Sequence, residues 1–147
     1  VRNIDFSLYD AVVVSDYNKG FLLEEDIKYI SEQNSCTFLD TKKQLGEWCN
    51  KVKFIKINDV ELEKSRKHIT QEIYDKTIIT HGKSGASHDN INYPVEEVEI
   101  KDTSGAGDTF LAGLVCKYLE SDSIEVAIPF ANLCATSVVQ RKGVSTV

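Results

Sequence analysis

Short apolar runs rich in β-branched residues alternate with longer, helix-like segments along this chain. The first run, residues 9–15 (YDAVVVS), has the continuous apolar centre that is typical of a strand buried on both faces. Residues 24–34 then show the spacing of apolar side chains expected of an amphipathic helix. Because such an alternation builds a parallel sheet covered by helices, the pattern predicts an α/β fold of the doubly wound type.

The same alternation continues to the end of the chain. Three further short strands are predicted, followed by a hairpin at the edge of the sheet and by two long helices joined at a capping segment. The predicted strands are 37–40, 54–57 and 77–80, the hairpin is 86–88 with 91–95, and the helices are 106–120 and 124–141. Polar residues or glycine follow the first four strands, where open parallel sheets place their ligands.

The composition limits the classes of protein to which the chain can belong. Its 147 residues fit one domain, and 17 basic against 23 acidic side chains give a net charge of −6. A general nucleic-acid or anionic-membrane binder needs a basic face, and no apolar run is long enough to cross a bilayer. The widely spaced cysteines favour free thiols in a reducing compartment. We therefore expect neither nucleic acid nor a membrane as a partner, and a cytoplasmic location.

The strongest chemical signal is the segment 102–109 (DTSGAGDT), which directly precedes a long apolar run. Gly105, Ala106 and Gly107 are small enough for the backbone to approach a ligand, and successive N–H groups at a helix start form an anion site. Asp108 would weaken anion binding there unless it accepts a proton from an attacking hydroxyl. The alternative interpretation is an acidic residue that interacts favourably with the helix dipole.

Two common phosphate-binding motifs are excluded by position. Residues 82–84 (GKS) resemble the end of a P-loop, but Thr77 stands where that motif needs its first glycine. Residues 105–107 (GAG) resemble the start of a dinucleotide fingerprint, but Phe110 stands where its last glycine should be.

Three motifs together resemble those of the ribokinase-like (PfkB) carbohydrate kinases. Residues 102–108 are similar to the family signature Asp-Thr-x-Gly-Ala-Gly-Asp, 58–61 (NDVE) to Asn-x-x-Glu, and 80–85 (THGKSG) to the nucleotide loop Thr-x-Gly-x-x-Gly. The resemblance implies a three-layer α/β/α fold with a mostly parallel sheet. Residues 1–147 match only the C-terminal half of a single kinase domain, so we expect the N-terminal part and the lid to be missing. The absence of methionine agrees with this expectation.

The resemblance implies an ATP- and magnesium-dependent phosphotransferase that acts on a sugar or a sugar phosphate. A monovalent cation is a further candidate cofactor, and a homodimer is a candidate assembly. In this scheme Asp108 is the general base, the N–H groups of Gly105, Ala106 and Gly107 stabilise the transferring phosphoryl group, and Asp102 binds the acceptor.

The resemblance also implies which residues hold the nucleotide and the metal. Glu61 and Asn58 are expected to organise magnesium, and the expected nucleotide-binding residues are Asn58, Thr80, Gly82, Gly85 and Asn132. Glu61 has an alternative role as a helix N-terminal acid, and Asn132 as a satisfied polar group on an apolar helix. Lys56 is expected to face either the phosphates or solvent. The family commonly has proline after the asparagine of Asn-x-x-Glu, where this chain has Asp59.

Further segments narrow the choice of acceptor substrate. Residues 15–20 (SDYNKG), 40–42 (DTK) and 141–145 (RKGVS) are similar to segments of the heptose 7-phosphate kinases of lipopolysaccharide precursor synthesis. Lys19 and Lys42, at strand ends, would suit an anionic sugar phosphate; alternatively, Lys19 lies in a plain turn and Lys42 is solvated. Two other functions stay open: a related kinase for fructose phosphate, ribose, a nucleoside or a vitamin-like alcohol, and a non-catalytic nucleotide-binding module.

Overall fold

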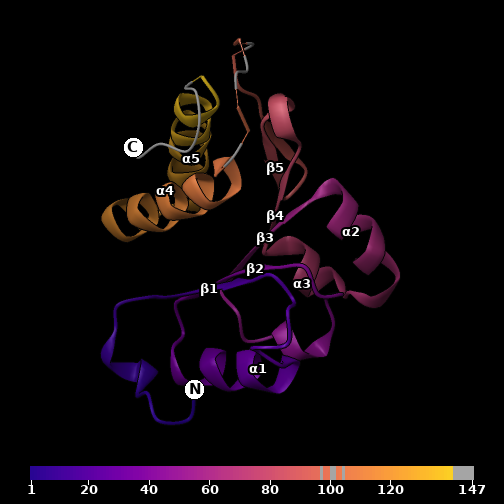
Figure 1. Ribbon diagram of the computed structural model, residues 1–147, viewed down its shortest axis with the longest axis vertical. Coiled ribbons are helices and arrows are strands. Elements are labelled where there is room, and N and C mark those ends of the chain that lie inside the picture. Colours follow the sequence, from indigo (N-terminus) through magenta and orange to yellow (C-terminus); the bar gives the residue numbers. More distant parts are fainter. Residues whose placement is uncertain (97, 100–101, 104, 141–147) are drawn as a thin grey trace. The chain divides into compact units, whose positions relative to one another are not determined.

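The computed structural model describes residues 1–96, 98–99, 102–103 and 105–140 (Figure 1). The described chain divides into two compact units, Val1–Thr80 with Ser87–Ile91 and His81–Ala86 with Asn92–Val147, and each is treated by itself. The segment 141–145, which resembles the end of the heptose kinases, lies outside the described residues.

Four parallel strands form the centre of the first unit. They are β1 (Val12–Asp16), β2 (Thr37–Thr41), β3 (Phe54–Asn58) and β4 (Thr77–Thr80). Each strand pairs with the next in parallel, so that the register sets Asp16 beside Thr41, and Asn58 beside Thr80. These strands confirm the predicted α/β fold, although β1 starts three residues later than expected.

The strand order continues through β5 (Ala86–His88) and β6 (Ile91–Tyr93), giving a six-stranded sheet in the order β1 to β6. Asp89 and Asn90 connect these two strands with φ values of 51° and 63°, as a two-residue hairpin loop of type I′ requires. The predicted hairpin is therefore present. Its second strand ends at Tyr93, before Pro94, because proline has no N–H group to donate.

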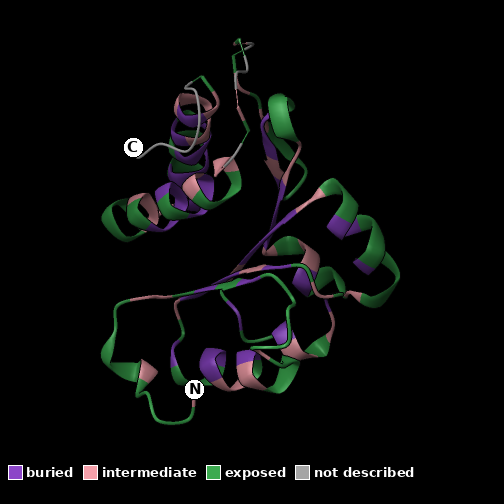
Figure 2. Ribbon diagram, in the orientation of Figure 1, coloured by how far each residue is buried: buried purple, intermediate pink, exposed green. Residues whose placement is uncertain are grey.

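Helices α1 (Glu24–Gln33), α2 (Asp59–Ser65) and α3 (Gln71–Asp75) complete the first unit, together with the short 3₁₀ turns η1 (Phe6–Leu8), η2 (Glu47–Cys49) and η3 (Arg66–His68). Ile27 and Ile30 of α1 are buried in one apolar cluster with Val14, Leu39 and Ile55 from the strands. This cluster contributes to the buried interior in Figure 2.

The predicted burial of the first strand on both faces is wrong. Val14 and Asp16 are buried, but Ser15 is exposed and Val13 is 46% exposed. β1 is the terminal strand of the described sheet, and within its own unit helix α1 covers only the face that carries Val14. β2, which has a neighbour on each side, is buried along almost its whole length, as is typical of a central parallel strand.

The second unit is built mainly from two long helices, α4 (Ala106–Ser121) and α5 (Ile124–Val139), with the 3₁₀ turn η4 (Gly82–Ser84) in its other segment. Both helices were predicted. They pack closely at Gly113, where an added Cβ atom would lie 2.9 Å from the Cys134 sulfur. Asp122, in the left-handed conformation, ends α4, and the Ser123 side chain accepts a hydrogen bond from the Val126 N–H to start α5.

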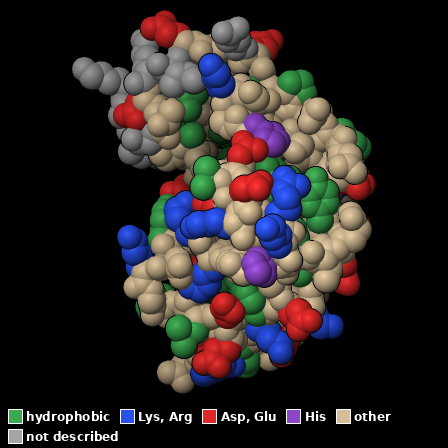
Figure 3. All heavy atoms as spheres, turned by 90° about the vertical axis from the view of Figure 1, so that its right-hand side faces the viewer, with side chains coloured by type: hydrophobic (Ala, Val, Ile, Leu, Met, Phe, Trp, Pro, Cys, Tyr) green, Lys and Arg blue, Asp and Glu red, His purple; other side chains and the backbone are tan. Residues whose placement is uncertain are grey.

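Charged side chains of both signs are interspersed over the face shown in Figure 3, in keeping with the near balance of 17 basic and 23 acidic residues. Among the described residues, the helices are too short or too polar for any of them to span a membrane.

Candidate functional site

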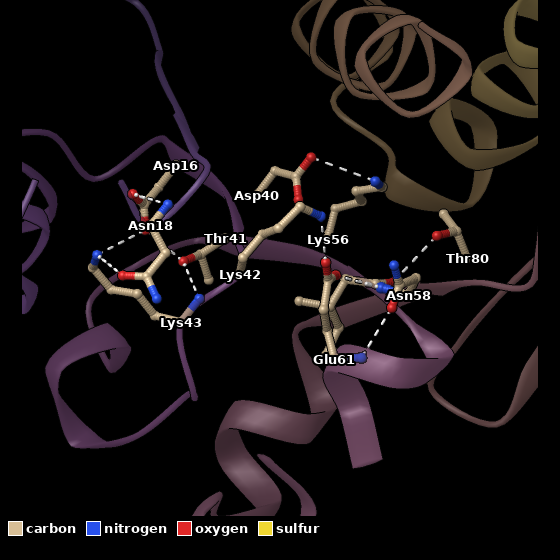
Figure 4. Close-up of polar contacts among 11 residues, drawn as sticks. Asp16, Asn18, Asp40, Thr41, Lys42, Lys43, Lys56, Asn58, Glu61 and Thr80 are labelled. Atoms are coloured by element: carbon tan, nitrogen blue, oxygen red, sulfur yellow. Dashed lines mark hydrogen bonds and ion pairs between the residues drawn. The ribbon is translucent and has the colours of Figure 1, made fainter. Parts of the chain in front are cut away.

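Polar side chains from β1 to β4 meet at the carboxyl end of the sheet (Figure 4). The register sets Asp40 beside Lys56, and Asn58 beside Thr80. Because all four strands run in the same direction, their last residues reach the same edge. The structure thus brings the predicted residues Asn58, Glu61 and Thr80 together in the first unit.

Asn58 and Glu61 form a capping box at the start of α2. The Asn58 side chain accepts a hydrogen bond from the Glu61 N–H at 2.9 Å, and Glu61 Oε2 accepts one from the Asn58 N–H at 2.8 Å. Glu61 Oε1 contacts the Lys42 ammonium at 2.8 Å, and the Glu61 side chain is only 8% exposed. Glu61 is therefore a helix N-terminal acid, and its second oxygen also faces a positive charge.

The Glu61 carboxylate fits the donor chemistry that magnesium needs. Magnesium keeps several of its waters and takes few protein carboxylates, so one fixed carboxylate oxygen is sufficient. The described residues contain no cluster of three or more His, Cys, Asp or Glu side chains that would hold a metal without water. Asn58 and Glu61 could hold a hydrated magnesium ion here, and this role stays a prediction.

Lys56 is buried beside Asp40, which rules out the solvent-exposed one of its two predicted alternatives. Its Nζ lies 3.4 Å from Asp40 Oδ2, and both side chains are largely buried. Burial raises the pKa of the Asp40 carboxyl above its usual range, although the neighbouring Lys56 opposes this shift.

The hydrogen bond to Glu61 raises the pKa of Lys42, so Lys42 is not simply solvated.

A third ion pair joins the ends of β1 and β2, and the sequence analysis missed it. Lys43 Nζ lies 3.2 Å from Asp16 Oδ2, with side chains 9% and 4% exposed. Asp16 also accepts hydrogen bonds from the Thr41 hydroxyl and the Asn18 N–H, and Lys43 donates to the Asn18 side chain. The one available signal was the juxtaposition of two lysines after β2, which does not say which of them turns inward.

The loop after β1 matches the alternative prediction of a plain turn. Asn18 and Gly20 have φ values of 57° and 92°, and Lys19 between them is exposed. Contact between Lys19 and a sugar phosphate stays a prediction.

Lys43→Met is expected to lower the free energy of unfolding by about 2–3 kcal/mol, because it leaves the buried Asp16 carboxylate without its counter-charge. Chemical denaturation measures this change. Lys28→Met removes an exposed lysine that pairs with Glu32 on α1 and should cost under about 0.5 kcal/mol. Equal effects of the two substitutions would contradict the structural importance of the Asp16–Lys43 pair.

In the second unit, the glycine-rich segment lies at the start of α4. Gly105 precedes the helix with φ 78°, and its carbonyl accepts a hydrogen bond from the Thr109 N–H at 2.9 Å. Asp108 lies exposed in the first turn, as predicted, and Asp102 is half-buried with its N–H directed to the Val139 carbonyl. This position agrees with both interpretations of Asp108, as a base and as an acid at the positive end of the helix dipole.

Gly85 and Asn132 meet at the backbone of Tyr93. The Asn132 side chain is buried and donates a hydrogen bond to the Tyr93 carbonyl at 2.9 Å, as expected of a satisfied polar group. An added Cβ atom at Gly85 would lie 2.2 Å from the same carbonyl oxygen. Gly82 has φ +59°, and no atom lies within 4 Å of the position of an added Cβ. Thr80, in the first unit, donates a hydrogen bond to the Ile57 carbonyl. Nucleotide binding by these residues remains a prediction.

Comparisons with known proteins agree with the motif order. The model of the pfkB family of carbohydrate kinases matches residues 1–147. Among curated relatives, the bifunctional protein HldE of Nitratiruptor sp. is 28% identical over 94% of this chain and 34% of its own length. The bifunctional protein HldE of Sulfurimonas denitrificans is 30% identical over 97% of this chain and 35% of its own length. The chain thus spans about a third of the length of these relatives.

Solved structures show the same fold. Ribokinase from Thermotoga maritima superposes with a TM-score of 0.77 at 18% identity, over 97% of this chain and 55% of that protein. Aminoimidazole riboside kinase from Salmonella enterica, solved with aminoimidazole riboside and an ATP analogue, superposes with a TM-score of 0.69 at 20% identity over 92% of this chain and 58% of that protein. The predicted ribokinase-like fold is therefore confirmed.

Proposed function

Because the chain belongs to the pfkB family of carbohydrate kinases, we propose that it is the nucleotide-binding and catalytic-base portion of an ATP-dependent sugar-phosphate kinase. The observation that carries the proposal is the position of the GAGD segment at the start of the 16-residue helix α4, in a chain whose full length matches the family. Since the chain covers about half of the solved kinases, we propose that it is the C-terminal part of one such domain.

The proposed reaction is an in-line phosphoryl transfer. Asp108 accepts the proton of the acceptor hydroxyl, whose oxygen bonds to the γ-phosphorus as the bond from that phosphorus to the ADP oxygen breaks. The N–H groups of Gly105, Ala106 and Gly107 lie at the positive end of α4, where they stabilise the charge on the transferring group. The Ala106 N–H donates to the Thr103 carbonyl at 3.2 Å in the structure and turns to the phosphoryl group in this scheme. Asp102 holds the acceptor, and magnesium, when bound, neutralises charge on the phosphates.

A heptose 7-phosphate is the acceptor that the observations favour. The supporting observations are the similarity to HldE proteins at 28–30% identity and the SDYNKG and DTK segments at the ends of β1 and β2. Of the three lysines at this edge of the sheet, Lys43 and Lys56 are buried in ion pairs, and Lys42 is the one whose side chain is half exposed. A phosphorylated acceptor would have use for positive charge here, whereas a neutral sugar would not.

The full-length protein, given magnesium and ATP, should phosphorylate a heptose 7-phosphate with kcat/KM at least about 10-fold above that for fructose 6-phosphate, ribose or adenosine, a difference of about 1.4 kcal/mol. A coupled assay of ADP release measures this preference. Turnover of another acceptor alone would replace the heptose proposal and keep the kinase. ATP binding without turnover of any acceptor would indicate a nucleotide-binding module instead.

Glu61→Gln is expected to weaken binding of magnesium-ATP by about 10-fold or more, because the amide cannot neutralise the hydrated metal. Glutamine still supports a capping box, so the free energy of unfolding should change little. Calorimetric titration with ATP, with and without magnesium, separates the metal from the nucleotide. Glu63→Gln, two residues along α2 and exposed, is the matched control. Equal affinities for wild type and Glu61→Gln would refute the metal assignment.

A further inference from the structure

Lys42 differs from the two other lysines at this edge of the sheet. Lys43 and Lys56 are ion-paired with Asp16 and Asp40, and their side chains are 9% and 10% exposed. Lys42 is ion-paired with Glu61, but its own side chain is 51% exposed. Of these three cations, Lys42 is therefore the one that can move without bringing a buried charge into solvent.

The partner of Lys42 is held in place. Glu61 is 8% exposed on its side chain, and its Oε2 is fixed by the Asn58 N–H at 2.8 Å. Its Oε1 contacts the Lys42 ammonium at the same distance, 2.8 Å. A fixed anion thus faces a cation on a flexible four-carbon side chain.

We propose that Lys42 is an exchangeable counter-ion, which neutralises Glu61 in the metal-free protein and moves to a ligand phosphate when a divalent cation binds. The proposal rests on the metal role of Glu61 under the proposed function. A lysine ammonium and a hydrated divalent ion repel one another strongly when both lie next to one carboxylate oxygen. The metal therefore displaces the ammonium, which then acts as a point charge for phosphate.

The proposed exchange predicts that removing the Lys42 ammonium changes two affinities in opposite directions. Removing the ammonium removes a competitor of the metal, so binding of the metal alone becomes stronger. It also removes a phosphate contact, so binding of a phosphate-bearing ligand becomes weaker. A lysine that only stabilised the fold, or only bound phosphate, would not produce both effects. The phosphate belongs either to the nucleotide or to the sugar phosphate, and separate titrations distinguish these sources.

The test compares the full-length protein with its Lys42→Met variant. Mn²⁺ alone, followed by electron paramagnetic resonance, should bind the variant about two- to fivefold more tightly, which is the size of a partly exposed ion pair. The Kd for magnesium-ATP or the KM for the sugar phosphate should rise about 10-fold, the loss of one charge-assisted phosphate contact. Lys28→Met, which removes a lysine paired with Glu32 on α1, should change neither.

The outcomes of this test separate a failure of the proposed Lys42 exchange from a failure of the proposed metal role of Glu61. Unchanged or weaker Mn²⁺ binding by Lys42→Met overturns the exchange, as does an unchanged affinity for both phosphate ligands. Glu61→Gln separates this failure from a failure of the metal site, since it should abolish Mn²⁺ binding. If Glu61→Gln binds Mn²⁺ as the wild type does, the metal role of Glu61 is wrong and the exchange falls with it. If the wild type binds no Mn²⁺ in the absence of nucleotide, the exchange alone is overturned, and the magnesium-ATP titration of Glu61→Gln still tests the metal role.

Discussion

Asp108→Asn is expected to lower kcat for phosphoryl transfer by about 10²–10⁴-fold, the usual contribution of a general base. The amide keeps the shape of the carboxylate but cannot accept the hydroxyl proton. Asp108 lies exposed in the first turn of α4, so the protein should remain folded after the substitution. A magnesium-ATP titration should show affinity equal to or slightly above that of the wild type, because a negative charge near the phosphates has been removed. Single-turnover kinetics in the full-length protein measure the loss.

The same helix supplies a matched control. Asp122 ends α4 with φ 54°, a left-handed conformation that asparagine also adopts readily. Asp122→Asn therefore makes the same chemical change at the opposite end of the helix and should leave kcat within about twofold, well under 1 kcal/mol in the barrier. If Asp108→Asn retained wild-type kcat, Asp108 would be only an acid that stabilises the helix dipole, and the proposed mechanism would fail.

Gly85→Ala is expected to lower the free energy of unfolding by about 3–5 kcal/mol, the sum of backbone strain and a steric clash. Gly85 has φ +94°, and its added Cβ atom would lie 2.2 Å from the Tyr93 carbonyl oxygen and 3.0 Å from Pro94 Cα. The clash involves backbone, which cannot move aside as a flexible side chain can. Asn132 donates to the same carbonyl, so the substitution should also disturb α5. Urea denaturation and amide hydrogen exchange at Asn132 measure the two effects.

Gly82→Ala is the matched control for this loop. Gly82 also has a positive φ, +59°, but no atom lies within 4 Å of the position of an added Cβ. Only the cost of the left-handed backbone applies, about 1–2 kcal/mol. Similar losses for the two substitutions would show that strain, and not the approach of Gly85 to Tyr93, sets the cost. Since Gly82 also belongs to the proposed nucleotide loop, a larger effect on magnesium-ATP affinity than on stability would support that role.

Local pattern was enough to predict the strands and long helices of this chain. Apolar runs such as 54–57 and 77–80 became β3 and β4 with almost the predicted bounds, because a short β-branched run favours a buried strand wherever it lies. The GAGD segment was placed correctly at a helix start for a similar reason. Helix signals of this kind act over a single turn and do not depend on distant residues.

The burial of individual side chains and the partners of polar side chains were predicted less well, because both depend on residues that lie far away in the sequence. The first strand has the apolar character of a fully buried strand, yet Val13 is 46% exposed, because within its unit α1 covers only the opposite face of β1, which carries Val14. Asn132 fits its predicted alternative as a satisfied polar group, but the sequence did not show its partner, the Tyr93 carbonyl 39 residues away. Lys43 lacked any distinguishing sequence feature, and it forms the most buried ion pair of the site.

The sequence by itself determined the α/β class, the order of the elements and the edge of the sheet at which the polar residues gather, since these follow from short-range periodicity and from the parallel direction of the strands. Only the tertiary structure decided which charges meet there. Strand register brings Asp40 to Lys56, and the turns after β1 and β2 bring Lys43 to Asp16 and Lys42 to Glu61. These pairs join residues 16 to 27 positions apart, and their formation depends on chain packing that no local pattern encodes.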